Sequence, residues 1–191
     1  MNYKHFNYIS RALCAILALI LSFAFCSCDT EEEYYDINNY SEDVEFCEAE
    51  KFMPNLNELG EYTDIEYLCT KNFAIFPEHT IKLIVKYSSE DYAKEKERLK
   101  TAYEYLDEPQ ISVSDYTMPV TSFSTEGFYI RVVKFEDTRY PKNFGMVGIS
   151  NETCEIAYLW VDSGDLDVIC AIDDDPNKEM IHKFNDWFDL K

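Results

Sequence analysis

The sequence is short of positive charge. Only 17 of its 191 residues are Lys or Arg, against 37 Asp or Glu, and the formal net charge is −20. A surface that binds nucleic acid needs clustered cations to displace the counterions of the phosphates, so we expect no nucleic-acid partner. Excess acid is typical of a soluble surface, and recognition of a basic partner is the less common alternative.

Glycine is also scarce, with five in the chain. There is no glycine-rich phosphate loop between a strand and a helix, and no G-x-S-x-G nucleophile turn. Gly145 and Gly148 form the one close pair, inside a strand-like stretch that no helix pattern follows. We interpret both as strand glycines with a packing role, and we predict no nucleotide cofactor.

Cysteine spacing excludes two further kinds of site. None of the seven cysteines forms a C-x-x-C pair, so the sequence does not support a zinc ribbon or a thioredoxin-type redox centre.

Two acidic clusters could supply some of the six to eight oxygens that a calcium ion needs, but turn preference and helix capping explain both clusters better. We therefore predict no metal site; the clusters are Asp162, Asp165 and Asp167, and Asp173, Asp174 and Asp175.

Candidates for catalysis are few. Strands at 64–70 and 80–87 could place Cys69 beside His79, but no third group is marked to orient them; His182 lies far away in the last helix. Carboxylates are plentiful, yet their spacing singles out no acid–base pair. We predict no enzymatic activity and no catalytic residue.

What the chain does have is an export leader. Residues 1–11 contain Lys4, His5 and Arg11 and no acid, and residues 12–25 are apolar and uncharged. A cationic start before a short apolar stretch is the layout of a secretory signal, and the stretch is shorter than the roughly 20 residues of a spanning helix. An uncleaved signal anchor is the alternative, and both interpretations place the remainder outside the cytoplasm.

The end of the leader, Phe25-Cys26-Ser27-Cys28, resembles the lipobox of bacterial lipoproteins, in which a small residue precedes the cysteine that receives the lipid. Ser27 occupies the small position and Cys28 that of the acceptor, whereas bulky Phe25 precedes Cys26. Phe25 departs from the leucine usual at that position. The resemblance covers residues 1–28 and implies lipid attachment at Cys28, with a plain signal peptide as the alternative.

Residues 29–50 hold ten acids and no Lys or Arg. Repulsion among these charges predicts an extended acidic tether over residues 28–50, on which the tyrosines could still dock onto the body. Acid directly after the lipid cysteine is also similar to the surface-export signal of Bacteroidetes lipoproteins. The predicted organisation is a signal peptide at 1–27, a tether at 28–50 and one globular domain at 51–191.

Four cysteines remain in the exported part of the chain: Cys47, Cys69, Cys154 and Cys170. They can pair into two disulfides in three ways, and the sequence favours neither disulfides nor buried free thiols.

The globular part predicts an α+β fold. Alternating apolar residues predict strands at 64–70, 80–87, 128–135, 145–150, 153–161 and 166–172, the last three forming an antiparallel meander. Residues 53–60 predict a short helical turn that ends at Gly60. One helix is capped by Ser88 or Ser89, and a second begins at Asp175 and Pro176. We expect both main helices to pack on one face of the sheet.

These features together predict a membrane-anchored extracytoplasmic lipoprotein whose domain binds a protein or a cell-envelope component without catalysis. Two other classes stay open at this point. One is a small extracellular hydrolase, and the other is an acidic inhibitor or immunity-type protein that neutralises a basic partner.

Overall fold

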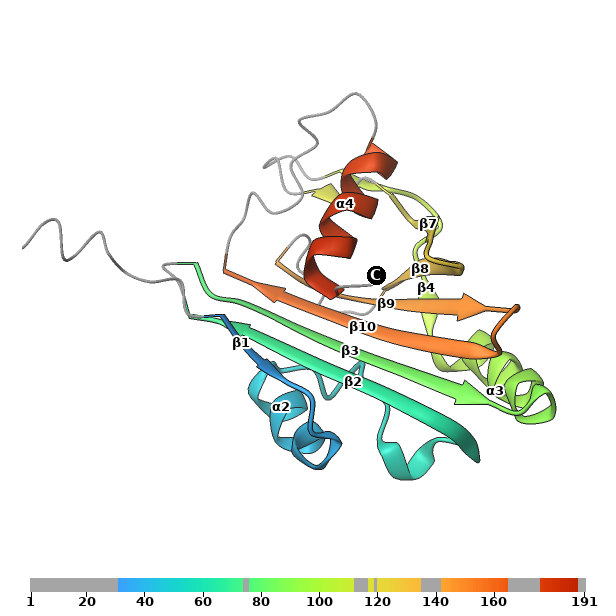
Figure 1. Ribbon diagram of the computed structural model, residues 1–191. Helices are drawn as coiled ribbons and strands as arrows, with labels where there is room; N and C mark the ends of the chain where they lie inside the picture. Colours follow the sequence, from blue (N-terminus) through green and yellow to red (C-terminus); the bar gives the residue numbers. More distant parts are fainter. Residues whose placement is uncertain are drawn as a thin grey trace, which may run out of the picture. The chain divides into compact units, whose positions relative to one another are not determined.

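A computed structural model describes residues 31–73, 76–111, 117–118, 120–134, 142–164 and 176–188. These residues form an α+β fold around an antiparallel sheet, as predicted (Figure 1). The sheet has eight strands in the order β1-β2-β3-β10-β9-β8-β4, with β7 paired to β8, and β5 and β6 pair separately. None of the described helices is long and apolar enough to cross a bilayer.

The strands are β1 (Glu31–Tyr34), β2 (Tyr62–Asn72), β3 (Glu78–Tyr87), β4 (Glu104–Tyr105), β5 (Gln110–Ile111), β6 (Thr117–Met118), β7 (Ser122–Thr125), β8 (Phe128–Lys134), β9 (Asn143–Ser150) and β10 (Glu155–Ser163). The helices are α2 (Tyr40–Phe46), α3 (Ser89–Ala102) and α4 (Pro176–Phe188), and the 3₁₀ turns are η1 (Ile37–Asn39) and η2 (Leu56–Glu58).

The strands predicted from alternation are confirmed where the structure describes them. β2 and β3 form a long hairpin, and β9 and β10 form another across the turn at 151–154. β10 pairs with β9 on one side and with β3 on the other, so the meander among the described strands consists of β8, β9 and β10. The predicted meander, in which a third strand follows along the free edge of β10, is wrong because β3 occupies that edge. The strand predicted at 166–172 lies outside the described residues.

The helix ends also follow the sequence. The Ser88 hydroxyl accepts the backbone N–H of Asp91 and so caps α3, while η2 occupies the helical turn expected before Gly60. α4 begins at Pro176 and buries Phe184, Trp187 and Phe188.

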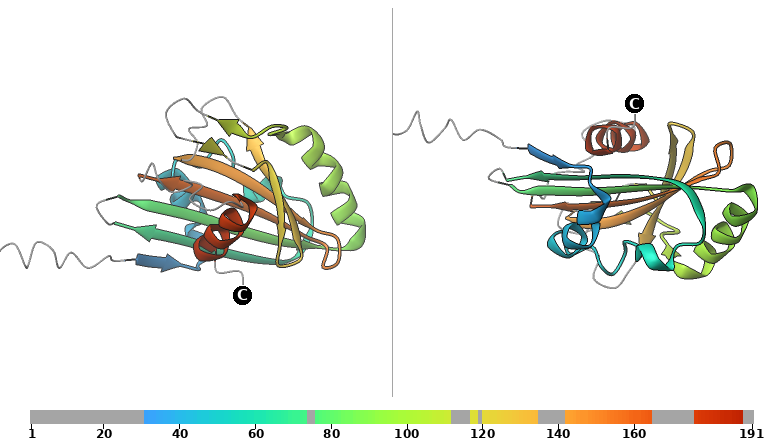
Figure 2. Two further views of the ribbon diagram at one scale, coloured as in Figure 1. Left: turned by 90° about the horizontal axis from the view of Figure 1, so that it is seen from above. Right: turned by 60° about the horizontal axis from the view of Figure 1, so that its bottom comes forward.

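The expectation that both main helices share one face of the sheet is not confirmed. Neighbouring residues of a strand point to opposite faces, and Leu83 and Ile84 of β3 belong to different core clusters. Leu99 of α3 packs in the cluster of Leu83, whereas Phe184 of α4 packs in the cluster of Ile84. Figure 2 accordingly shows α4 on one side of the sheet and α2 and α3 on the other.

The prediction of an extended tether is wrong for residues 31–50. β1 pairs with β2, and Tyr40, Val44 and Cys47 are buried in the core beneath α2. These three side chains follow helical spacing, and their burial outweighs the repulsion among exposed acids on the other side of α2. The described fold therefore includes residues 31–50, which the sequence had placed outside the globular domain.

Candidate functional site

The structure forms a groove of about 610 Å³ on the face of the sheet covered by α2 and α3. We call it the α2–α3 groove. Three parts of the chain line it: Tyr40, Ser41 and Val44 of α2, residues 50–58, and Arg98, Ala102 and Tyr103 at the end of α3. Its volume lies within the range of about 300–1,000 Å³ that is usual for small-ligand sites.

The wall formed by residues 50–58 is fixed by Phe52. Its ring stacks on Trp160 of β10, with centroids 5.8 Å apart and planes inclined by 23°. On β9 it lies against Gly145, where an added Cβ would come within 2.5 Å of the ring. At Gly148 an added Cβ would come within 3.3 Å of Ala157 and Ile130, a less severe but still tight approach, so the prediction of two strand glycines with a packing role is confirmed.

Two tyrosine hydroxyls hold the same segment from either side. Tyr40 donates to the carbonyl of Pro54 over 2.7 Å, and Tyr103 donates to the carbonyl of Phe52 over 2.9 Å. Burial raises the pKa of both phenols well above the usual value, so both stay protonated as donors. The backbone of the groove wall is thus anchored by side chains from α2 and from the end of α3.

The charge of Arg98, at the α3 side of the groove, is already paired. The Arg98 guanidinium donates to both carboxylate oxygens of Glu95, at 2.9 Å from Nε, and Glu95 also accepts the hydroxyl of Tyr158 at 3.0 Å. Exposed Asn55 and Asn57 add amides, next to the aromatic rings of the wall. Because the rings of Tyr40 and Phe52 are buried within the wall, the groove offers mainly amides beside paired charges, which suit a polar ligand held by hydrogen bonds.

A second polar cluster lies between α2 and the sheet. Asp43 is buried and accepts the Lys71 ammonium at 2.7 Å and the Tyr67 hydroxyl at 2.6 Å. Burial lowers the pKa of Lys71, but its hydrogen bond to Asp43 raises it, and the net direction is upward. Because its members satisfy one another, this cluster holds α2 on β2.

The sequence candidates Cys69 and His79 lie on neighbouring strands and on the same face, because Cys69 pairs with Ile81 and His79 is two residues before Ile81 on β3. Each has other neighbours. The His79 ring packs between Phe46 and Phe73, with centroids 5.2 and 5.8 Å away, and burial lowers its pKa. Among the described contacts, Cys69 and His79 therefore do not form the hydrogen-bonded dyad that the sequence left open.

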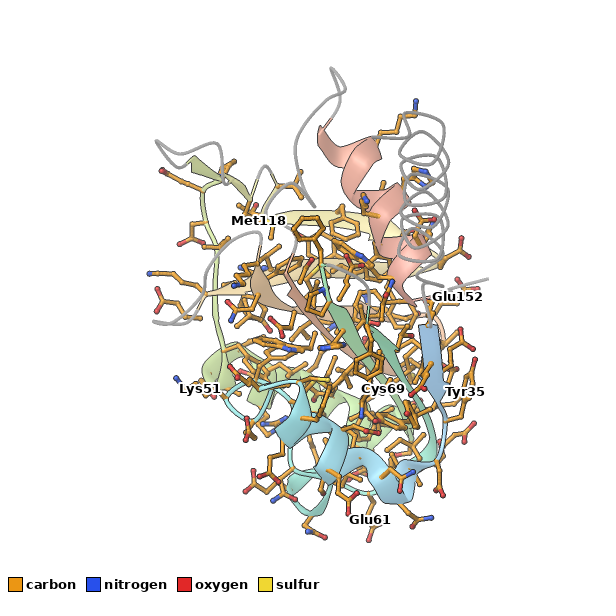
Figure 3. All side chains as sticks on the ribbon, turned by 90° about the vertical axis from the view of Figure 1, so that its left-hand side faces the viewer. Tyr35, Lys51, Glu61, Cys69, Met118 and Glu152 are labelled. Carbon is orange, nitrogen blue, oxygen red and sulfur yellow. The ribbon has the colours of Figure 1, made fainter. Side chains whose placement is uncertain are left out.

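Cys69 instead lies beside Cys47. A hydrogen bond between the two thiols is the largest cause that raises the pKa of Cys47, ahead of burial, so this thiol stays protonated. Both cysteines are free and fully buried, and Figure 3 shows Cys69 between the sheet and α2. A protonated, buried thiol is a poor nucleophile. Of the pairings that the sequence left open, Cys47 with Cys69 is the one brought together; Cys154 lies near Ser89, and Cys170 is outside the described residues.

The other sequence candidates lie largely beyond the described parts. Cys28 precedes the first described residue, and Asp165, Asp167 and Asp173–Asp175 fall in the gap after Gly164. Asp162 is described in β10, opposite His79 on β3, and burial raises its pKa. Within the described ranges, no group of three or more metal-ligating side chains could hold an ion. His182 lies exposed on α4.

Sequence reasoning missed the α2–α3 groove entirely. The signal for its α2 wall was the spacing of Tyr40, Val44 and Cys47, but its other wall depends on contacts between residues far apart in the chain.

Comparison with known proteins adds no relative: no family model, no curated protein and no solved structure matches the chain.

Proposed function

We propose that the chain is an exported lipoprotein in which the leader at 1–27 is removed and Cys28 carries the lipid. The domain then lies outside the cytoplasm, at a bacterial membrane. The observation that carries this proposal is the order of residues in the leader. A start with Lys4 and Arg11 and no acid is followed by the apolar residues 12–25 and then by Ser27-Cys28. The lipobox-like residues supply the chemistry, since a diacyl thioether anchor needs one free cysteine after a small residue.

We further propose that the domain is a non-catalytic binding module, with the α2–α3 groove as the site for a protein segment or a cell-envelope component. Two observations support binding over catalysis. Arg98, which lines the groove, is paired with Glu95, and Lys71 is paired with Asp43 behind α2. The buried thiol of Cys47 is held in its unreactive form.

Metabolic labelling with an alkyne fatty acid tests the anchor. We expect label on the wild-type chain and on Cys26→Ala, and none on Cys28→Ala, because only the second cysteine follows a small residue. Loss of the label in Cys26→Ala, or no label on the wild-type chain, contradicts the assignment of Cys28.

Groove binding is tested by nuclear magnetic resonance with soluble peptidoglycan fragments and with a mixed peptide library as two defined probes. We expect one of them to shift amide signals within residues 50–58. Ala102→Trp, which fills the groove, should abolish the shifts, and Ala93→Trp, exposed on the same helix outside the groove, should preserve them. Shifts that survive Ala102→Trp, or steady conversion of a probe to product, contradict the proposal.

A further inference from the structure

Three phenylalanines gather at one end of the sheet with much of their surface exposed. Phe46 at the end of α2 and Phe73 after β2 are each 50% exposed, and Phe76, in the same connection between β2 and β3, is 60% exposed. We call these three residues the aromatic patch. Large apolar side chains grouped at one edge of a soluble domain mark a contact surface more often than scattered ones do.

Two of the three rings are held in place. The ring centroids of Phe46 and Phe73 lie 6.4 Å apart in an edge arrangement, and both rings pack on His79. The Lys71 ammonium lies 4.2 Å from the centroid of Phe46 and fixes its other side. Exposure of these rings is therefore built into the fold, because interior contacts orient them outward.

A short piece of chain connects the strand beside the patch to the predicted anchor. Glu31 pairs with Asn72, the residue directly before Phe73, and Cys28 is three residues before Glu31. Figure 1 shows the start of β1 and the connection from β2 to β3 at the same end of the sheet. An extended chain spans at most about 3.6 Å per residue, so Cys28 lies within about 11 Å of Glu31.

We propose that the aromatic patch contacts the surface of the bilayer into which the lipid on Cys28 inserts, and so orients the domain on its membrane. This inference rests on the proposed lipid attachment at Cys28. Lipidation holds residue 28 at the level of the headgroups, and the short link brings the end of the sheet to the same level. Aromatic rings favour this interfacial layer.

The charge around the patch selects the kind of lipid. Glu31, Glu32 and Glu33 are exposed on β1 beside it, and the ammonium of Lys71, which lies against the Phe46 ring, is paired with Asp43. Anionic headgroups would repel these carboxylates, whereas zwitterionic headgroups would not. The partner is therefore a zwitterionic bilayer surface. Because the sheet is long, docking at this end directs the opposite end of β2 away from the membrane.

Tryptophan quenching by brominated lipids tests the contact directly. Lipidated chain is purified from bacterial membranes and reconstituted in vesicles of phosphatidylcholine with brominated or unbrominated acyl chains. The variants are Phe76→Trp and, as control, Tyr62→Trp, an exposed aromatic position about 30 Å away at the other end of β2. Trp160 and Trp187 are buried and give both variants the same background.

We expect brominated vesicles to cause a loss of emission from Phe76→Trp beyond that of the parent, and no added loss from Tyr62→Trp. Replacing part of the lipid by phosphatidylglycerol at low salt should reduce the loss. Equal quenching of the two variants, measured on lipidated chain bound to vesicles, overturns the proposed orientation on the membrane but does not contradict lipid attachment at Cys28.

Two other outcomes overturn the inference in different ways. If the intact mass of the sample shows no lipid on Cys28, the proposed function fails together with it. If the emission of Phe76→Trp shifts to the blue with rising protein concentration in the absence of vesicles, a second copy of the chain covers the patch instead of lipid.

Discussion

Replacing Gly145 by alanine adds one carbon where β9 passes beneath the ring of Phe52. The new Cβ would lie 2.5 Å from Cδ2 and 2.6 Å from Cγ of that ring, well inside the separation of about 3.5–4.0 Å at which carbon atoms pack. Phe52 cannot yield freely, because its ring stacks on Trp160 and its carbonyl accepts the Tyr103 hydroxyl. Overpacking of this kind costs about 1–3 kcal/mol of unfolding free energy.

Urea unfolding followed by circular dichroism measures this cost. With a slope of about 1–3 kcal/mol per molar urea, the midpoint of Gly145→Ala should fall by about 1 M. Gly60→Ala is the matched control, because no atom lies within 4 Å of its added Cβ, and its midpoint should stay level or rise slightly. Equal midpoints for the two alanine variants would refute the role assigned to Phe52 in fixing the groove wall.

A double-mutant cycle identifies the clashing partner. In a Phe52→Ala background the ring is gone, so Gly145→Ala should lose most of its destabilising effect, with a coupling free energy of about 1–3 kcal/mol. Additive losses would show that the added carbon acts through some other neighbour.

Three further expectations concern the buried polar groups. Asp43→Ala leaves the buried ammonium of Lys71 without its carboxylate and should lower the free energy of unfolding by about 3–5 kcal/mol in urea titrations; a loss under about 1 kcal/mol would contradict a buried ion pair. Burial lowers the pKa of His79, so the unfolded chain binds this proton more readily, and stability should be present above the unfolded pKa of about 6.5 and be lost as the pH falls below it. Besides burial, the positive charge of Lys71 lowers the pKa of His79, whereas the carboxylate of Asp162 raises it. His79→Gln should therefore lessen the pH dependence of stability between about pH 7 and 5, and an unchanged pH dependence would contradict the burial of this imidazole. Under native conditions, N-ethylmaleimide should modify half-buried Cys154 before the two cysteines buried beneath α2, as peptide mapping would show, and early modification of either buried thiol would contradict their placement.

Local patterns predicted the parts of the fold that depend on neighbouring residues. β3 and α3 follow from alternating and helical spacing, and the Ser88 cap was visible beside Asp91. The order of the strands was not visible, because β3 lies between β2 and β10, which come from distant parts of the chain. The sheet has helices on both faces, so its strand order also decides which of the two core clusters each helix packs against.

The segment at 31–50 shows a different limit. Its acids dominate the composition and favour an extended chain, yet Tyr40 and Val44 carry a helical apolar stripe that the composition hides. The groove could not be predicted at all, because one wall depends on a ring from residue 52 meeting a glycine on β9 and an indole on β10. Only the tertiary fold brings these three together.

The chemical state of residue 28 tests the whole account most directly. Mass spectrometry of the chain purified from bacterial membranes should find Cys28 as the first residue, with a diacylglycerol thioether and the leader absent. Recovery of the chain in the soluble fraction, with residues 1–27 still attached and the thiol unmodified, would contradict the anchor, the location and the membrane orientation together.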